Sequence, residues 1–317
     1  MRGSLIETQF QPTLLEPTMI LNHKRRGLSL VELIVVFAII GLVMSLALSG
    51  VQKVRVSAAR ARCQNNVRQL ALGLHQYHDH HSAFPPGFTR DAGKGSMRLS
   101  WHTRILPFIE QEPLWQAVLQ AYSTDPAPHT SNHPPHQTIQ RTPVPTFFCP
   151  SDPRSQLGNP AESQLVVALT SYPGVIGTDR LARDGILFSR SAINLTHVRD
   201  GSSSTVLVGE RPPPTNLLYG WWYGGIGDDG EGSVEVILGT SELNHSPLGL
   251  GGCPYGPYSF RAGSFQDNCS RFHFWSPHTG GANFAFADGS VRFLRYSANN
   301  ILPALATRAG GEVVVLE

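Results

Sequence analysis

Residues 24–51 read Lys-Arg-Arg-Gly-Leu-Ser-Leu-Val-Glu and then Leu-Ile-Val-Val-Phe-Ala-Ile-Ile-Gly-Leu-Val-Met-Ser-Leu-Ala-Leu-Ser-Gly-Val. This segment is the strongest indication of the architecture. The run 33–51 has no charged side chain. As an α-helix it would be roughly 28 Å long, about the thickness of the hydrocarbon core of a bilayer. The basic residues 24–26 precede it, and such flanks stay on the cytoplasmic side. We therefore expect one helix that spans the cytoplasmic (inner) membrane once, with the N-terminus in the cytoplasm and 52–317 outside it.

Glu32 is a carboxylate at the edge of this apolar run. An ionisable group at membrane depth is unfavourable without a partner, so it marks a functional residue. A conventional secretory signal has a shorter apolar core, followed by a small-residue cleavage site. Here the small residue, Gly27, comes before the apolar run. A plain membrane anchor is the other alternative, but it gives Glu32 no partner.

Residues 27–32, Gly-Leu-Ser-Leu-Val-Glu, resemble the prepilin processing signal of type IV pilins and type II secretion pseudopilins. The resemblance implies that a prepilin peptidase cleaves after Gly27 and methylates the new N-terminal residue, Leu28. It also implies that Glu32 pairs with the N-terminal amine of a neighbouring subunit during assembly. Leu28 stands where this family most often has phenylalanine. A leader of 1–27 is long for the family, and initiation at Met19 instead of Met1 would give a compact one.

The composition of the remaining chain favours loop-rich β structure. Charged residues make up only 15% of the sequence, while it contains 31 glycines and 24 prolines. The formal net charge is +2, which gives no reason to expect a nucleic-acid partner.

The four cysteines have no Cys-x-x-Cys spacing, which argues against a zinc knuckle. In an exported chain they can form two disulfides with three connectivities. We favour Cys253–Cys269, which closes a loop rich in glycine, proline and aromatic residues, and Cys63–Cys149, which ties the helix to the rest of the chain. Free buried thiols are the alternative.

The helix is expected to continue beyond the membrane. Apolar residues recur at three- and four-residue steps, with one longer gap at 64–66, and they are Val51, Val54, Ala58, Ala61, Leu70 and Leu74. Phe-Pro-Pro-Gly at 84–87 ends any helix. We therefore divide the chain into a leader, 1–27, a pilin-like helix, 28–82, with its membrane part at 28–51, and an exported α+β head, 83–317.

Within the head, 101–122 predicts a second helix or a pair of short helices, and 125–145 predicts an exposed linker. Short strands are expected at 165–170, 185–188, 205–209 and 234–238. Residues 283–294 predict an antiparallel hairpin, because two alternating segments flank Asp288-Gly289. An Asp-Gly pair favours a two-residue turn with positive φ.

These fragments, in their order, resemble the domain of unknown function (DUF) 1559 family of exported bacterial proteins, which carry a prepilin-type N-terminus and a His-x9-Asp-Gly signature. The signature residues here are His278, Asp288 and Gly289. The other matching fragments are Cys-Gln-Asn-Asn at 63–66, Phe-Pro-Pro-Gly at 84–87, Phe-Cys-Pro-Ser-Asp at 148–152 and Gly-Glu-Arg at 209–211. The resemblance implies a pilin-like protein but no known reaction.

Two clusters are candidate metal sites. His75 and His78 lie three residues apart on the expected helix, with Asp79 beside them and His80 and His81 following, and such a pair can share a zinc ion. Capping of the helix end is the alternative. The Gly-rich loop at 227–232 carries Asp228, Asp229 and Glu231, whose oxygens suit Ca²⁺, although it lacks EF-hand spacing. A solvated turn is the alternative there.

Two further groups of residues are candidate sites. His278 and Asp288 form an acid/base pair if the hairpin brings them together, but no serine or cysteine nucleophile has a recognisable setting. Trp221-Trp222-Tyr223 can stack sugar rings, with core packing as the alternative.

We expect a non-enzymatic prepilin-like protein without a cofactor, which is a structural or interaction subunit of a type II secretion or type IV pilus-like system. Its partners would be prepilin peptidase, other pilin or pseudopilin subunits and the membrane. One alternative is a membrane-tethered extracytoplasmic binding protein for carbohydrate or a small solute, which uses the prepilin signal only for export. A tethered hydrolase is the other.

Overall fold

The structure is a computed structural model of the whole chain. It describes residues 29–90, 98–126, 134–159, 166–224, 227, 230–245, 252–312 and 314. Contacts divide the chain into two compact units, Met1–Lys53 and Val54–Glu317, which are described separately. One helix, α1 (Leu30–His81), contributes residues to both units.

In the first unit, the described residues of α1 are apolar and exposed. The side chains of Phe37, Leu42 and Met44 are 64%, 63% and 57% exposed, so no described residue of the unit covers them. By length and composition α1 is able to cross a membrane. Ser29 and Glu32 form a capping box at the start of the helix. The Ser29 N–H donates to the Glu32 carboxylate at 2.8 Å, and the Glu32 N–H donates to Ser29 Oγ at 3.2 Å.

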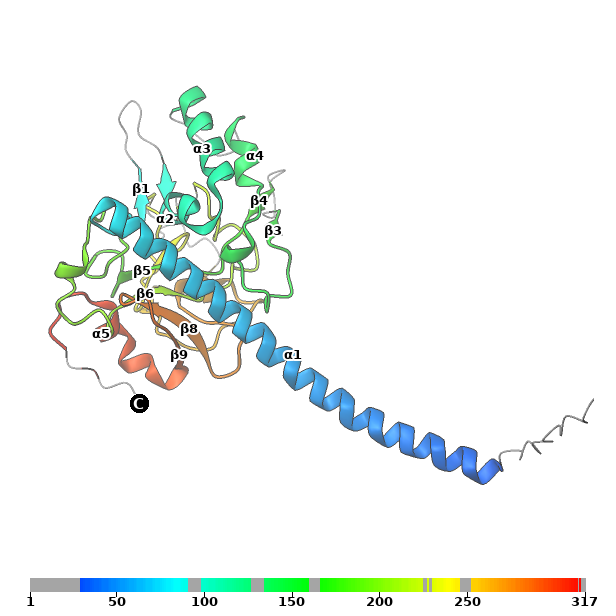
Figure 1. Cartoon of the computed structure of the whole chain (residues 1–317). Coiled ribbons are helices and arrows are strands. Elements are labelled where there is room, and N and C mark those ends of the chain that lie inside the picture. The colour runs from blue at the N-terminus through cyan, green and yellow to red at the C-terminus, as the bar shows by residue number, and fades with distance from the viewer. Residues whose placement is uncertain are drawn as a thin grey trace, which may run out of the picture. The chain divides into compact units, whose positions relative to one another are not determined.

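The second unit is built on a five-stranded sheet with the order β7-β5-β6-β8-β9. Figure 1 labels β5, β6, β8 and β9 of this sheet. All neighbouring strands are antiparallel except β5 and β7, which are parallel. The strands are β5 (Gly174–Gly177), β6 (Val206–Gly209), β7 (Ile237–Gly239), β8 (Gly281–Phe286) and β9 (Val291–Arg295).

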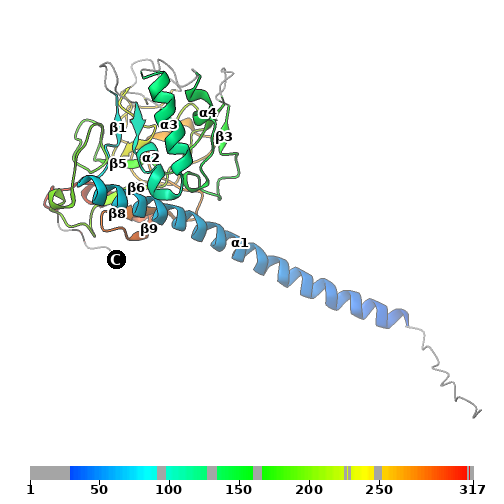
Figure 2. The ribbon, with the colours of Figure 1, turned by 45° about the horizontal axis from the view of Figure 1, so that its top comes forward.

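Both faces of this sheet are buried, because alternate side chains enter two different cores. Ala285 of β8 joins the core formed with the second half of α1, whereas Phe284 and Phe286 join the opposite core. Figures 1 and 2 both show α1 crossing the sheet near β8 and β9. The opposite core contains Phe260, Phe272, Phe274 and the short helix α5 (Leu302–Ala306).

The part of α1 that packs on the head presents one stripe of buried residues, which are Cys63, Val67, Leu70, Ala71 and Leu74. Their spacing is that of one helix face. Gly73 lets η1 (Leu106–Ile109) approach closely, because a Cβ there would lie 2.8 Å from Ile109. At the edge of the contact, the Arg60 guanidinium lies 3.5 Å from the centre of the Phe293 ring.

The remaining elements belong to the second unit. They are β1 (Phe88–Thr89), β2 (Leu99–Ser100), α2 (Trp101–Arg104), η1 (Leu106–Ile109), α3 (Glu112–Thr124), α4 (His136–Gln140), η2 (Pro145–Phe147), β3 (Leu157–Gly158), β4 (Val167–Ala168), η3 (Leu195–His197), η4 (Asn268–Phe272) and η5 (Tyr296–Asn300). The predicted α+β class with a long N-terminal apolar helix and a sheet-containing head is therefore confirmed.

Some local expectations need correction. Residues 185–188 are not a strand, although Gly185 and Leu187 donate backbone hydrogen bonds to β5. The β8–β9 hairpin is present, but its loop has three residues, because Ala285 pairs with Val291 and the Phe286 N–H bonds to the Ser290 carbonyl. Of the two residues at the turn, only Gly289 has positive φ, at 82°. This is the three-residue loop in which one residue in the left-handed region follows a turn.

Both expected disulfides are present. Cys63 of α1 is bonded to Cys149, across 86 residues of sequence. Cys253 is bonded to Cys269, across 16 residues. The first disulfide therefore joins α1 covalently to the segment that follows η2.

Candidate functional site

His278 lies in the loop before β8, beside the Cys63–Cys149 disulfide. Its Nε2 is 3.8 Å from Cys149 Sγ and 3.4 Å from Glu210 Oε1. The backbone N–H of His278 donates to Ser276 Oγ at 3.1 Å, which fixes the loop. The side chains of His278 and Glu210 are only 3% and 1% exposed.

Glu210 directly follows β6 and is held by β8. The Asn283 N–H donates to Glu210 Oε2 at 2.7 Å, and Asn283 Nδ2 donates to Oε1 at 3.1 Å. Burial, and secondarily the Glu210 carboxylate, raises the pKa of Tyr172 well above its usual value, so this phenol stays protonated. A buried carboxylate is unfavourable without polar partners, and Asn283 and the His278 imidazole are the partners of Glu210.

A compact group of metal-ligand residues results. Among the residues that the structure describes, Cys63, Cys149, Glu210 and His278 place one donor atom each within 4.8 Å of one another, and all four are buried. They come from α1, the segment after η2, the end of β6 and the loop before β8. We call these four residues the Cys-His-Glu cluster.

The hairpin turn lies against a different part of α1. A Cβ on Gly289 would be 3.4 Å from the His75 ring, and the Asp288 carboxylate accepts a hydrogen bond from the Ser290 N–H at 2.8 Å. Desolvation by burial is the main reason why the pKa of His75 is lowered. The segment from His278 to Gly289 thus contacts α1 at both ends, at the disulfide and at His75.

His278 and Asp288 do not meet across the hairpin. The carboxylate beside His278 is that of Glu210, whereas Asp288 bonds within its own turn and lies 3.9 Å from Arg292. The candidate acid/base pair of His278 and Asp288 is therefore wrong, because the carboxylate that faces His278 is that of Glu210.

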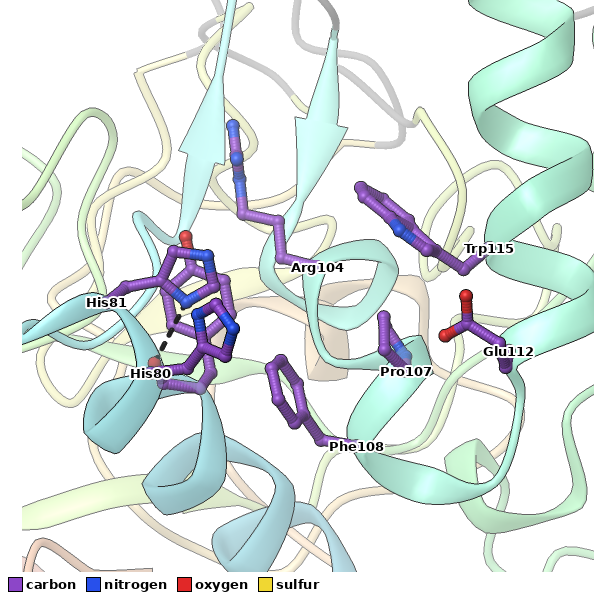
Figure 3. Close-up of a pocket in the computed structure, with 8 residues that line it drawn as sticks. His80, His81, Arg104, Pro107, Phe108, Glu112 and Trp115 are labelled. Carbon is purple, nitrogen blue, oxygen red and sulfur yellow. Dashed lines mark hydrogen bonds between the residues drawn. The ribbon is translucent and has the colours of Figure 1, made fainter.

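An open cavity of about 340 Å³ lies between the end of α1 and the α2–α3 region. Figure 3 shows His80 and His81 on one side, Glu112 and Trp115 of α3 on the other, and Phe108 between them. Tyr77 and His81 stack with ring centres 3.9 Å apart, and His81 Nδ1 lies 3.0 Å from the Tyr77 carbonyl oxygen. Arg104 and Pro107 complete the lining. The cavity combines aromatic faces with one cationic and one anionic side chain.

The family profile of a protein of unknown function, DUF1559, matches residues 52–300. That match covers most of the chain and nearly all of the head. The chain belongs to the DUF1559 family. The profile of the prokaryotic N-terminal methylation motif matches residues 22–48. Comparison with curated proteins and with solved structures finds no match.

The two matches, together with α1, show what class of protein this DUF1559 member is. It is a pilin-like or pseudopilin-like exported protein with a membrane anchor. The methylation motif implies processing by a prepilin peptidase. Gly27 and Leu28 lie outside the described residues. Glu32 is described, and its carboxylate caps its own helix through the Ser29 N–H.

The other metal candidates in this DUF1559 chain have different surroundings. The rings of His75 and His78 pack on Phe84, with centres 5.6 and 4.9 Å from the Phe84 ring, and His78 Nε2 accepts a hydrogen bond from the Leu195 N–H. Of the calcium candidates, Asp228 and Asp229 lie outside the described residues. Glu231 forms an ion pair with Arg183 at 2.6 Å.

Two of the three residues at 221–223 fill the core. Trp222 and Tyr223 are 0% and 1% exposed, and their polar atoms bond to the Thr142 carbonyl and to His136. The sugar-stacking interpretation is therefore wrong for these two rings. The packing alternative accounts for them.

The sequence pattern assigns no role to Glu210, although the Gly-Glu-Arg motif is part of the family resemblance. Glu210 is the acidic member of a motif whose arginine, Arg211, is also fully buried. Burial lowers the pKa of Arg211 to about 10, and its guanidinium donates to the Val234 and Glu235 carbonyls. The signal available was two adjacent opposite charges at the end of an apolar strand, which indicates buried and paired side chains.

Proposed function

We propose that the protein is a structural subunit of a filament of the type II secretion or type IV pilus-like kind. In this proposal a prepilin peptidase cleaves after Gly27, the N-terminus of α1 remains on the cytoplasmic side, and the head lies outside the cytoplasmic membrane. The role requires no catalytic residue, because the head acts by contact with other subunits.

The observation that carries the proposal is the exposure of the apolar half of α1. Every residue of 30–48 is exposed, and the candidate membrane window has no part buried within the chain. Such a surface is stable only in lipid or against other helices. The match to the methylation motif favours both environments. In this proposal the helix lies in the membrane before assembly and in a bundle of subunits after it.

Glu32 supports assembly, because its charge can do more than cap α1. A glutamine at the third helical position fulfils a capping box as well as a glutamate does. The amine of a neighbouring subunit, in contrast, gains an ion pair only from the carboxylate. The charge and the cap can therefore be separated by substitution.

The test compares Glu32→Gln, Glu32→Ala and Ser29→Ala in cells that express the full chain with two different tags. Co-purification of the two tags after chemical cross-linking reports subunit contact, and the size of the membrane-extracted protein reports processing. We expect Glu32→Gln and Glu32→Ala to lose at least nine tenths of the cross-linked product while processing continues. Ser29→Ala, which removes the hydroxyl half of the cap, should cross-link like the wild type.

Other outcomes would contradict the proposal. If Glu32→Gln assembles normally and only Glu32→Ala fails, the residue acts as a helix cap. If all variants, including the wild type, remain monomeric in the membrane, the chain is no filament subunit.

The cavity at the end of α1 supports a second candidate function, a tethered binding protein for carbohydrate. The cavity lining includes Trp115, Arg104 and Glu112. An aromatic face can pack on a sugar ring, and charged groups can bond to its hydroxyls. Titration of the full chain in detergent with a panel of disaccharides, followed by tryptophan fluorescence, tests it. A saturable change that Trp115→Phe removes supports binding, and no change with any sugar of the panel contradicts it.

A further inference from the structure

The Cys-His-Glu cluster has the dimensions of a metal site. A tetrahedral zinc ion with one nitrogen and one oxygen ligand at about 2.0–2.1 Å holds those atoms about 3.3–3.4 Å apart, and a thiolate sulfur at about 2.3 Å lies about 3.5 Å from the nitrogen. In the structure, His278 Nε2 is 3.4 Å from Glu210 Oε1 and 3.8 Å from Cys149 Sγ. The imidazole and the carboxylate are therefore placed as ligands of one ion would be.

The two sulfurs are bonded to each other in the structure, at 2.06 Å. They become ligands only when that bond is reduced, so a disulfide and a metal ion exclude each other here. We propose that Cys63, Cys149, Glu210 and His278 bind one Zn²⁺ ion when the two cysteines are reduced, and that the disulfide is the oxidised form of the same site.

The choice of metal follows from the donor atoms. Two thiolates and an imidazole are soft or borderline ligands, which favour Zn²⁺ over Ca²⁺ or Mg²⁺. All four residues are buried, so the site is closed in the manner of structural zinc sites. Glu210 is oriented by Asn283, as the carboxylate ligands of metal sites are oriented by hydrogen bonds from the next shell of residues.

In the zinc form, two thiolates and one carboxylate oppose the two positive charges of the ion, which leaves one net negative charge in the pocket. The Asn283 N–H and Nδ2 donate to Glu210 and face that charge.

The interconversion is a two-electron step. A disulfide oxidant accepts two electrons from the two zinc-bound thiolates and takes up two protons to become a dithiol. The Cys63–Cys149 bond forms, and Zn²⁺ leaves. The reverse reaction uses a dithiol reductant and needs Zn²⁺ to bind the released thiolates. In either form α1 stays tied to the segment after η2.

The test uses the full chain in detergent with Cys253→Ser and Cys269→Ser, so that the cluster holds the remaining thiols. After reduction by a phosphine without oxygen, Co²⁺ is added as a spectroscopic probe and Zn²⁺ as the competitor. We expect one Co²⁺ per chain with thiolate charge-transfer absorption, and its displacement by Zn²⁺. At a hundredfold excess over its dissociation constant, Zn²⁺ should raise the melting temperature of the reduced chain by about 5–10 °C.

Single substitutions connect these signals to the cluster. Cys63→Ser should abolish the two-thiolate spectrum, and His278→Ala and Glu210→Gln should each weaken Zn²⁺ binding at least tenfold. His197→Ala, at an exposed histidine in η3, should bind like the parent. Oxidation of the zinc form should release one Zn²⁺ per disulfide formed, measured with a zinc indicator.

Two results would overturn the inference. The first is a reduced, folded chain that shows no thiolate–cobalt absorption, or one whose binding is unchanged by His278→Ala. The second concerns a reduced chain that has lost its near-ultraviolet circular dichroism and is therefore unfolded. If Zn²⁺ does not restore that signal, the site is rejected.

Discussion

At the residue scale, Glu242 shows how burial controls an ionisable group in the head. Its carboxylate accepts hydrogen bonds from the Gly239 and Leu243 N–H groups, at 2.8 and 3.2 Å. Desolvation outweighs these bonds and raises the pKa of Glu242 from 4.5 to about 7. Because the pKa is higher in the folded state, this group stabilises the fold below about pH 4.5, and that contribution is lost as the pH rises through 7.

Glu242→Gln removes this titration. We expect the free energy of unfolding of the variant, relative to the wild type, to increase by roughly 3 kcal/mol between about pH 4 and about pH 8. Denaturant titration at both pH values measures it, and Glu112→Gln, at an exposed position on α3, is the matched control. If the wild type and Glu242→Gln follow parallel curves with pH, the buried carboxylate has no such role.

Gly289 is the residue at which the hairpin turn depends on glycine. Its φ of 82° is unfavourable for a residue with a Cβ. Gly289→Ala should destabilise the head by about 1 kcal/mol, measured by denaturant titration, and Gly289→Asn should lose less, because asparagine tolerates positive φ. Equal stability of all three proteins would show that the turn relaxes freely.

At the scale of elements, the sequence predicted best where a local pattern has a single solution. Alternating residues around Asp288-Gly289 predict the hairpin correctly. The turn type was wrong, because the register of β8 and β9 determines the loop length, and that register depends on burial of both faces of β8. Strand β5 was missed for a related reason, since all four of its residues are buried and none alternates.

The helix α1 shows the same limit. Its extent was predicted within two residues, because the apolar run and Phe-Pro-Pro-Gly mark its ends. The predicted packed stripe was right for two of its six residues, since Leu70 and Leu74 are buried but Val51, Val54, Ala58 and Ala61 are exposed. Cys63 and Val67 fill the gap that the periodicity left. Which face of a helix meets the head depends on distant residues, and a single sequence does not contain their positions. Glu210 was missed for a similar reason, because the other members of the Cys-His-Glu cluster lie far from it in the sequence.

The two disulfides join elements at different separations, and this gives a prediction. Closing 86 residues removes more freedom from the unfolded chain than closing 16. Under oxidising conditions with a chelator, Cys63→Ser/Cys149→Ser should lose about 4–5 kcal/mol of stability and Cys253→Ser/Cys269→Ser about 3 kcal/mol, measured by denaturant titration. A larger loss for the second pair would contradict this ranking.

At the scale of the whole molecule, the two units have opposite relations to their surroundings. The head buries both faces of its sheet and ties α1 to itself by a disulfide, a cation–π contact and the stripe from Cys63 to Leu74. The first half of α1 leaves its apolar side chains exposed within the chain. In the proposed function, only the second property would connect the molecule to a membrane and to other subunits. That property was readable from residues 24–51, because helix length and charge placement are local features.

Mass spectrometry of the N-terminus of the protein isolated from membranes is a direct test of the proposed processing. We predict a chain that begins at Leu28, with or without one methyl group on its amine, from cells that contain prepilin peptidase. Cells without the peptidase should yield only uncleaved chains. Peptides that run intact through Gly27 and Leu28 in the presence of the peptidase would contradict the processing on which filament assembly rests.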